Sequence, residues 1–362
     1  MKFLLSPCGT STLTNLATPK ERKLISQYAN VNSPREVLDS SDLSHLEGLI
    51  NQAKGELSTA DLQRARDLSA ELKCLIHYCE FQFDPADQHV LLCTDTWLGE
   101  ETGKLIQIWL QNQGASVQLV RHKDLQTYDP DAFQLSLAEL VSWCSDTIPG
   151  YRKAHYRIIF NLTGGFKSIQ GFLQTLAMFY ADETIYTFER SETLLRIPRL
   201  PVKLDAVASI QEHLEIFRRL SQKLPVQPTS NLPETLIRFM EGQPWLSEWG
   251  RLVWEQSKQD IYGEKLLPSI SPLIHFGPHF SKTAEKIARD RLIILNTRLD
   301  QLACFVETNY NPPSLDFKAL KGDPVPGSTH EFDAWADLDA KRVFCHYDGN
   351  TVVLDSLAKK LS

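Results

Sequence analysis

Short apolar segments alternate with amphipathic helical segments over the first half of the chain, and this alternation limits the possible folds most. Between helices expected within 36–82 and at 101–113, 135–144 and 169–180, strands are predicted at 3–6, 90–93, 117–120, 157–161 and 184–188. Such alternation is typical of a mainly parallel sheet covered on both faces. We therefore expect residues 1–205 to form a doubly wound, Rossmann-like α/β domain, in which 36–82 is a helical insertion between the first two strands.

The rest of the chain predicts a different architecture. A chain of 362 residues exceeds what one hydrophobic core usually supports. Residues 206–265 are expected to form a helical connector packed by its tryptophans. Residues 266–362 are expected to form an α+β domain: a strand at 273–276, one long helix over 280–308, then an antiparallel sheet from strands at 329–332, 342–347 and 351–354. Asp348 and Gly349 are suited to the hairpin turn between the last two strands.

Composition narrows the functional classes. The net charge of -7 argues against a general nucleic-acid binder, so any such site has to be a local basic patch. The seven cysteines are scattered and form no CxxC pair, which is typical of reduced thiols in the cytosol, and no cluster has the spacing of metal ligands. No apolar run approaches the length of a membrane span or a signal peptide, so we expect a cytoplasmic protein. Because no cluster has the spacing of metal ligands, we also expect no bound metal.

Two segments rich in small residues follow the first and fourth strands. They are Ser6–Ser11, with the sequence SPCGTS, and Asn161–Ser168, with the sequence NLTGGFKS. Ligands of open α/β sheets bind at the carboxyl ends of the strands, where glycines and helix N-termini accommodate phosphates. Lys167 adds a positive charge, and Thr10, Ser11 and Thr163 add hydroxyl groups. The spacing of a P-loop or of a dinucleotide-binding motif is absent. The alternative is that both segments are only tight turns.

The pair of motifs resembles the CARF domains of type III CRISPR accessory proteins, in which both motifs line the ligand pocket. The resemblance covers 1–205 and implies a homodimer that binds a cyclic oligoadenylate. The ring commonest in the family is cyclic tetra-adenylate, although this sequence leaves the ring size open. The residues implied to contact the ligand are Thr10, Ser11, Gly164, Gly165 and Lys167, with Thr94 and Asp95 as weaker candidates. Some CARF domains also cleave their ligand slowly, so ring nuclease activity stays open here.

The C-terminal domain carries candidate RNA-binding cations. Lys282, Lys286 and Arg289 follow one another at i, i+4 and i+7, which places them on one face of the long predicted helix. Lys318 and Lys321 add two cations in the following loop. We expect these five residues to contact RNA or the ribosome, with a merely solvated helix face as the alternative.

The last three strands carry side chains suited to metal-independent RNA cleavage. That reaction needs a base for the 2′-OH, cations for the phosphorane and an acid for the leaving oxygen. His330 and Glu331 lie on one predicted strand and Arg342 and His346 on the next, while Lys359 and Lys360 follow the last strand. Together these residues could supply all three roles. The alternative for each histidine is a structural or surface residue.

The order of elements in 270–361 resembles RelE/HigB-type toxins, on weak motifs that include Leu315–Gly322, Ser328–Phe332, Arg342–Phe344 and the final lysine pair. The resemblance implies cleavage of mRNA on the ribosome. It also implies that Arg342 binds phosphate and that Lys359 or Lys360 is the terminal basic residue. Where some members have two lysines, this chain has His330 and Glu331, of which we favour His330 as base. Residues 266–362 hold 11 Lys and Arg against 12 Asp and Glu, which is acidic for a ribosome-docking toxin.

The combination resembles the CRISPR-Cas-associated mRNA interferases. It implies an endoribonuclease in type III CRISPR antiviral defence, allosterically activated by a cyclic oligoadenylate and dependent on the ribosome, with no membrane or duplex DNA as partner. Three alternatives stay open. They are a transcription regulator with a winged helix in 206–265, a HEPN-type ribonuclease, for which the spacing of Arg342 and His346 is poor, and an adaptor with an inactive toxin fold.

Overall fold

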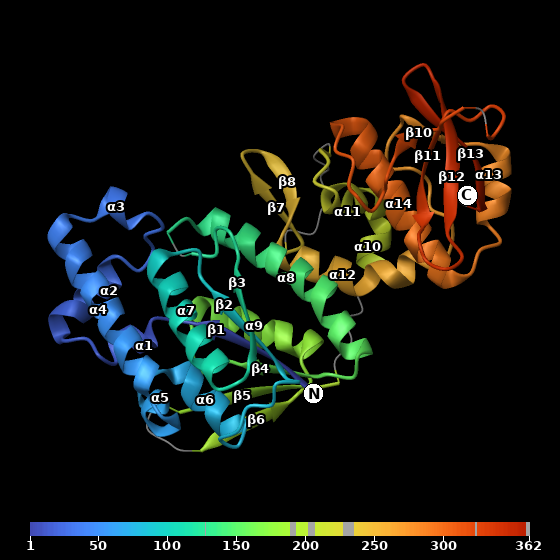
Figure 1. The fold of residues 1–362 in the computed structure, drawn as a ribbon. Helices are drawn as coiled ribbons and strands as arrows, with labels where there is room; N and C mark the ends of the chain where they lie inside the picture. Colours follow the sequence, from blue (N-terminus) through green and yellow to red (C-terminus); the bar gives the residue numbers. More distant parts are fainter. Residues whose placement is uncertain (127, 189–192, 202–206, 227–234, 323, 360–362) are drawn as a thin grey trace. The chain divides into compact units, whose positions relative to one another are not determined.

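The computed structural model describes residues 1–126, 128–188, 193–201, 207–226, 235–322 and 324–359. The chain divides into two compact units, Met1–Lys203 and Leu204–Ser362, and each is described by itself (Figure 1). No helix in these described ranges is long and apolar enough to cross a lipid bilayer.

The first unit is built on a six-stranded sheet with the order β3-β2-β1-β4-β5-β6. Its strands are β1 (Lys2–Cys8), β2 (Gln88–Cys93), β3 (Ser116–Arg121), β4 (Arg157–Asn161), β5 (Glu183–Thr187) and β6 (Leu194–Pro198). The first five strands are parallel, which confirms the predicted sheet, and β6 adds an antiparallel edge. Strand order reverses between β1 and β4, where open α/β sheets bind ligands.

Nine helices of the first unit connect and cover these strands in the described residues. They are α1 (Ser11–Thr14), α2 (Pro19–Gln27), α3 (Pro34–Val37), α4 (Ser40–Thr59), α5 (Leu62–Leu68), α6 (Ala70–Tyr78), α7 (Trp97–Asn112), α8 (Pro130–Lys153) and α9 (Lys167–Tyr180). Helices α6 and α7 pack on the strands, and the inserted helices α4 and α5 pack in turn on α7 and α6, while α8 and α9 contact β4 and β5 (Figure 1). The insertion predicted at 36–82 is therefore divided among several helices.

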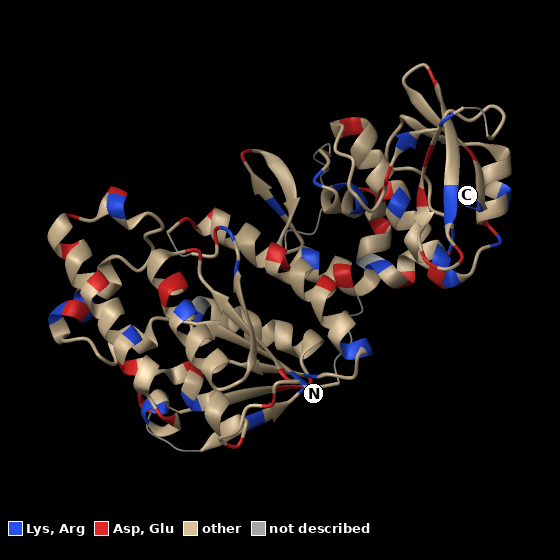
Figure 2. Cartoon of the chain, viewed as in Figure 1, with Lys and Arg blue, Asp and Glu red and all other residues tan. Residues whose placement is uncertain are grey.

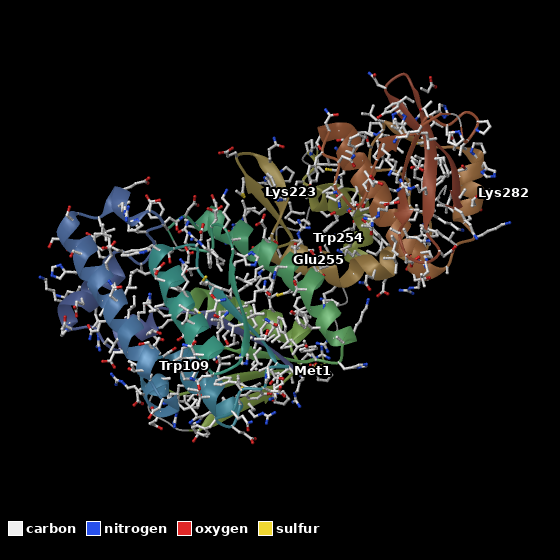
Figure 3. The ribbon with its side chains drawn as sticks, in the orientation of Figure 1. Met1, Trp109, Lys223, Trp254, Glu255 and Lys282 are labelled. Atoms are coloured by element: carbon white, nitrogen blue, oxygen red, sulfur yellow. The ribbon has the colours of Figure 1, made fainter. Side chains whose placement is uncertain are left out.

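The second unit begins with a small subdomain that is only partly helical. Its elements are α10 (Val207–Glu212), α11 (Leu214–Ser221), β7 (Ile237–Met240), β8 (Gln243–Leu246) and α12 (Glu248–Tyr262). They share a hydrophobic cluster around Trp254, which Figure 3 marks. The β7–β8 hairpin departs from the all-helical expectation. Glu241 and Gly242 both have positive φ, as a two-residue hairpin turn requires.

A five-stranded sheet with the order β10-β11-β12-β13-β9 forms the rest of the second unit. Its strands are β9 (Ile274–Phe276), β10 (Lys318–Ala319), β11 (His330–Trp335), β12 (Lys341–Asp348) and β13 (Thr351–Lys359), and its helices are α13 (Pro278–Ala284) and α14 (Arg289–Thr308). Strands β11 to β13 are antiparallel, as expected, β10 adds an unpredicted antiparallel edge, and β9 pairs parallel to β13. Buried leucines of α14, such as Leu295 and Leu299, share a core with Phe332 and Val343 of the sheet.

The prediction of one long helix over 280–308 is wrong. Helix α13 ends at Ala284, and α14 starts only after Ala288, which has extended backbone angles. The apolar positions Phe280, Ala284 and Ile287 all contact the core and follow helical spacing, so the pattern alone predicts a continuous helix. The turn at 285–288 brings these residues and α14 onto the same sheet.

A buried ion pair joins the two parts of the second unit. Arg218 of α11 and Asp300 of α14 are almost fully buried, and their closest N–O distance is 2.6 Å. The Tyr262 hydroxyl at the end of α12 donates a hydrogen bond to the same carboxylate. The segment predicted as a separate connector at 206–265 is thus part of the same compact unit as 266–362.

Candidate functional site

The two glycine-containing loops predicted to bind a ligand lie against each other at the reversal point of the first sheet. Gly9 follows β1, and Gly164 and Gly165 follow β4. A Cβ atom added to Gly9 would lie 3.2 Å from Cα of Gly165. Gly165 has a φ of +95°, and a Cβ there would lie 2.9 Å from Cβ of Pro7. Backbone therefore packs on backbone, and side chains larger than hydrogen would force the loops apart.

A buried carboxylate, which the sequence analysis missed, ties these loops together. The Glu71 side chain of α6 accepts hydrogen bonds from the Gly9 amide (2.8 Å), the Ser11 hydroxyl (2.6 Å) and the Ser69 hydroxyl (2.8 Å). A Cβ on Gly164 would collide with the same carboxylate. Ser11 is therefore already engaged inside the protein. Burial, and then the Glu71 charge, raise the pKa of the nearby Cys8 thiol.

Other groups at this edge remain open to a ligand. Lys167 is the first residue of α9, is exposed, and has no ion-pair partner within the described residues. Thr10 precedes α1, and its hydroxyl makes no capping hydrogen bond. The Thr163 hydroxyl, by contrast, accepts a hydrogen bond from the Thr187 amide. The edge thus offers one free cation, the Thr10 hydroxyl and the backbone of Gly164 and Gly165.

The two weaker candidates at the end of β2 are occupied by internal contacts. Thr94 is buried, and its hydroxyl lies 2.9 Å from that of Thr96. The Asp95 carboxylate accepts hydrogen bonds from Arg121 (2.7 Å) and from the Asp124 amide (2.8 Å). These contacts fix the neighbouring turn, and they leave neither side chain free to bind a ligand in this conformation.

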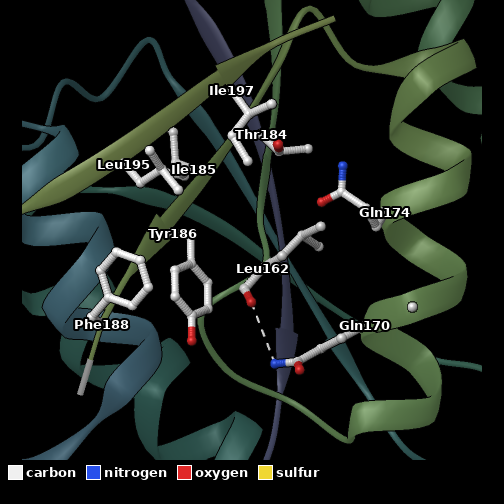
Figure 4. A pocket seen from close by; sticks show the side chains of 10 residues that line it. Leu162, Gln170, Gln174, Thr184, Ile185, Tyr186, Phe188, Leu195 and Ile197 are labelled. Carbon is white, nitrogen blue, oxygen red and sulfur yellow. Dashed lines mark hydrogen bonds between the residues drawn. The ribbon is translucent and has the colours of Figure 1, made fainter.

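A cavity of about 400 Å³ lies beside the second loop, between α9 and strands β5 and β6 (Figure 4). Its walls are mainly apolar and include Leu162, Tyr186 and Leu195. The Gln170 side chain closes one end by donating hydrogen bonds to the carbonyls of Leu162 and Gly164. The cavity therefore shares a wall with the Gly164–Gly165 loop. The sequence analysis placed no site here.

In the second unit, Arg342 is buried and paired with carboxylates instead of being presented to solvent. Its guanidinium lies 2.8 Å from Asp316 and 3.0 Å from Asp333. A third carboxylate, Glu331, lies 3.1 Å away. Only 1% of Arg342 is exposed. In this conformation the guanidinium cannot reach an RNA phosphate. Lys318, and then Arg342, hold the pKa of Asp316 below its usual value.

His330 lies among aromatic rings at one end of β11. Its ring stacks on Phe317 and meets Tyr347 edge-on, with centroid distances of 5.3 and 5.0 Å. Nδ1 is 2.9 Å from the Thr329 hydroxyl, and partial burial lowers the pKa of the imidazole. His330 is therefore largely neutral at neutral pH, as a general base must be. Glu331 pairs with Arg342 and makes no ion pair with His330 in the described part of the chain.

A second histidine, which the sequence analysis names without giving it a catalytic role, has a carboxylate partner. His346 Nδ1 lies 2.8 Å from Asp355 Oδ1, and the Ser328 hydroxyl donates to the other carboxylate oxygen at 2.7 Å. This arrangement orients the ring and leaves Nε2 available. The pair joins β12 to β13 beside a register shift at Phe344 and Cys345, which alternation along the strands does not reveal.

The predicted RNA-binding cations do not form one face. The helix break separates Lys282 of α13 (Figure 3) from Arg289 of α14, which pairs with Asp260, and Lys286 lies in the turn between them. Lys318 pairs with Asp316 at 2.6 Å, whereas Lys321 and Lys359 are exposed. Lys360 lies outside the described residues. Figure 2 shows basic and acidic segments interspersed over this unit. Across the described residues, no group of three or more His, Cys, Asp or Glu side chains could hold a metal ion.

Part of the first unit matches a known protein family. Residues 66–200 match the model of a family described as CRISPR-associated protein (Cas_APE2256). The match includes Glu71, the Gly164–Lys167 loop and the walls of the cavity, but not the Gly9–Ser11 loop. No curated protein matches the chain.

Solved structures that align with the chain include two with bound cyclic nucleotides. Enterococcus italicus Csm6 bound to cyclic hexa-2′-fluoro-hexa-dAMP is 12% identical, over 62% of this chain and 46% of that chain, with a TM-score of 0.28. Can2 from Sulfobacillus thermosulfidooxidans in complex with cyclic tetra-adenylate is 11% identical, over 79% of this chain and 76% of that chain, with a TM-score of 0.24. This chain therefore spans less than half of the Csm6 chain. Residues 66–200 are similar to a CRISPR-associated family.

Proposed function

We propose that this protein is an endoribonuclease of type III CRISPR defence that a cyclic oligoadenylate activates. In this proposal the first unit is the sensor, and the second unit cleaves mRNA on the ribosome without a metal ion. The chain acts as a homodimer that binds one ring across its two-fold axis, with cyclic tetra-adenylate as the favoured activator.

The observation that carries the proposal is the contact between the Gly9 loop and the Gly164–Gly165 loop at the reversal point of a parallel sheet. That position favours nucleotide ligands, because backbone amides and a helix N-terminus face the phosphates. Lys167, at the start of α9, supplies the charge. The match of residues 66–200 to a CRISPR-associated family supports a role in CRISPR defence.

For RNA cleavage, the second unit offers two histidines on neighbouring strands. His330 is favoured as the base because its pKa is lowered and the imidazole is neutral at neutral pH. His346 is the alternative, since Asp355 orients its ring. Lys321 and Lys359 are exposed cations that could meet the RNA phosphates. Arg342 would hold the sheet together unless activation releases it from its three carboxylates.

Ligand binding to the first unit could affect residues 266–362 through the 206–265 segment. That segment packs on 266–362 through the buried Arg218–Asp300 pair. A ring that binds one arrangement of the dimer better than another would shift the population toward it. Activation would then change the second unit as a whole.

The test is cleavage of ribosome-bound mRNA and of free RNA, with and without cyclic tetra-adenylate. We expect cleavage only when both ribosome and ring are present. Lys167→Ala should abolish the ring dependence, while Lys20→Ala, which removes an exposed lysine on α2, should not. His330→Ala and His346→Ala then identify the base. Cleavage that ignores the ring would contradict the sensor role.

One observation favours a second candidate, an adaptor whose second unit is catalytically inactive. Arg342, the residue implied to bind phosphate, is buried among carboxylates. If no RNA is cut under any condition while the ring still binds, the adaptor is the better assignment.

A further inference from the structure

The cavity between α9 and the β5–β6 pair has no role in the proposal so far. It opens beside the loop that holds Gly164 and Gly165, and its walls combine apolar side chains with a few polar ones (Figure 4). A cavity of about 400 Å³ with this composition is within the range of small-molecule sites.

A buried hydroxyl on its wall lacks a partner. Thr184 is 5% exposed, and its Oγ1 has no hydrogen-bond partner among the residues that the structure describes. Leaving such a group unsatisfied costs about 1–3 kcal/mol, so it points to a group that arrives from outside. The Gln174 side chain is exposed and extends from α9 toward the strand of Thr184, so its amide is available to a ligand (Figure 4).

The free cation of the adjacent loop lies on the same face of α9 as the cavity. Lys167, Gly171 and Gln174 follow one another at i, i+4 and i+7, and the last two line the cavity. Tyr186 and Phe188, whose ring centroids are 5.1 Å apart, stand on the opposite wall. A flat apolar ligand with hydrogen-bonding edges and a neighbouring phosphate would satisfy all of these groups.

We propose that this cavity binds an adenine base, with Gln174 and Thr184 at its polar edge and Lys167 on the adjoining phosphate. The inference rests on the proposed sensor function and specifies where one base of the ring is held. Aromatic side chains and amides are the groups that proteins use to bind an unstacked base.

Gly171 allows the cavity to be filled without disturbing the loops. A Cβ atom at this position meets nothing within 4 Å, and leucine is a better helix former than glycine. Gly171→Leu should therefore fold and weaken binding of cyclic tetra-adenylate to the full-length protein at least tenfold in isothermal titration. Gly171→Ala should bind nearly as well as the wild type. Gly150→Leu, at an equally open glycine of α8, is the matched control.

Thr184→Val tests the polar edge of the cavity, because it should change the melting temperature and ring binding in opposite directions. Removing an unsatisfied buried hydroxyl should raise the melting temperature of the ligand-free protein, while ring binding should weaken several-fold. A threonine with only a packing role would not change both in opposite directions.

A titration with adenosine monophosphate (AMP) distinguishes the two ligands that could supply an adenine base, namely the cyclic oligoadenylate and a free mononucleotide. If the wild type binds the ring and Gly171→Leu binds it equally well, the cavity assignment is wrong and the sensor proposal stands. If the wild type binds AMP but no ring, and Gly171→Leu loses AMP, the cavity is an adenine site and the sensor proposal falls. Binding of neither overturns both. If Gly171→Leu converts a dimer to a monomer in sedimentation while the ring still binds, the cavity contacts a second copy and the base assignment is wrong.

Discussion

Glu71 connects the residues on which ligand binding would depend. Its carboxylate accepts from Gly9 and Ser11 on one loop and contacts Gly164 on the other, in a fully buried position. Buried acceptors of this kind are stabilising only while every donor remains paired. The geometry of this edge of the sheet should therefore depend on a residue that lies inside the protein.

Replacing Glu71 by glutamine tests this dependence. The amide keeps the shape but turns one acceptor into a donor, which faces either the Gly9 amide or two hydroxyls. We expect a loss of about 1–3 kcal/mol in the free energy of unfolding by urea, together with weaker ring binding. Glu47→Gln, on the exposed face of α4, should change neither. If stability falls while ring binding is unchanged, Glu71 stabilises the fold but does not influence ligand binding.

His89 predicts a pH dependence of stability for the same unit. The imidazole is buried, neither ring nitrogen has a hydrogen-bond partner in the described residues, and burial lowers its pKa to about 4. Between pH 6.5 and 4 the unfolded chain binds a proton that the folded chain does not, so stability is lost as pH falls. The wild type should lose roughly 3 kcal/mol more than His89→Leu between pH 7 and 4, measured by urea unfolding. Parallel pH profiles would exclude this assignment.

We expect the main effect of replacing Arg342 to be a loss of stability. Replacing it by methionine leaves three carboxylates near one another without their cation, so the unfolding free energy should fall by about 3–5 kcal/mol. Lys359→Met, an exposed cation of β13, is the control and should change little. If Arg342→Met removes RNA cleavage at unchanged stability, the residue meets the substrate directly.

At the scale of elements, α8 carries a proline inside its helix. Pro149 removes a backbone donor in the last part of Pro130–Lys153, whereas Pro130 occupies the first turn, where no donor is needed. Pro149→Ala should raise the unfolding free energy, by up to about 3 kcal/mol. Pro130→Ala should give no such gain. Equal effects of the two changes would mean that the inner proline is accommodated without loss.

Strands that consist of buried apolar runs could be predicted from the sequence. Elements that are defined by contacts with segments distant in the sequence could not. Val90–Cys93 and Arg157–Asn161 read as strands because both faces of a parallel strand are buried. Strand β6 has an exposed face and is defined by its pairing with β5. The break at 285–288 could not be predicted, because the buried residues of α13 and α14 pack on one sheet and together follow a continuous helical spacing.

The same distinction holds for the candidate sites. The Gly9 and Gly164 loops were predictable because they follow strands whose carboxyl ends share one edge of the sheet. Glu71 lies 62 residues from Gly9, and local spacing does not indicate such a contact. His346 and Asp355 meet across a shifted register, and Arg342 takes its partners from the neighbouring strand β11 and from the loop before β10.

At the scale of the whole molecule, each compact unit has its own hydrophobic cores. The first unit packs its core around β1 and β2, and the second has one cluster around Trp254 and one under β11 and β12. Because separate cores unfold independently unless an interface couples them, calorimetry of the full chain should show two transitions. Pro149→Ala should move only the transition of the first unit, and Arg342→Met only that of the second, which assigns each transition.

Ligand linkage then tests how the units communicate. A ring at 100 times its dissociation constant should stabilise the unit that binds it by about 2.7 kcal/mol, and Lys167→Ala should remove that shift. If only the first transition moves, binding does not stabilise the folded second unit, and activation must work by rearranging folded units. If the ring also lowers the second transition, its binding free energy destabilises the second unit, which could release Arg342 from its carboxylates. A single transition that the ring raises would instead mean that the two units unfold together as one cooperative structure.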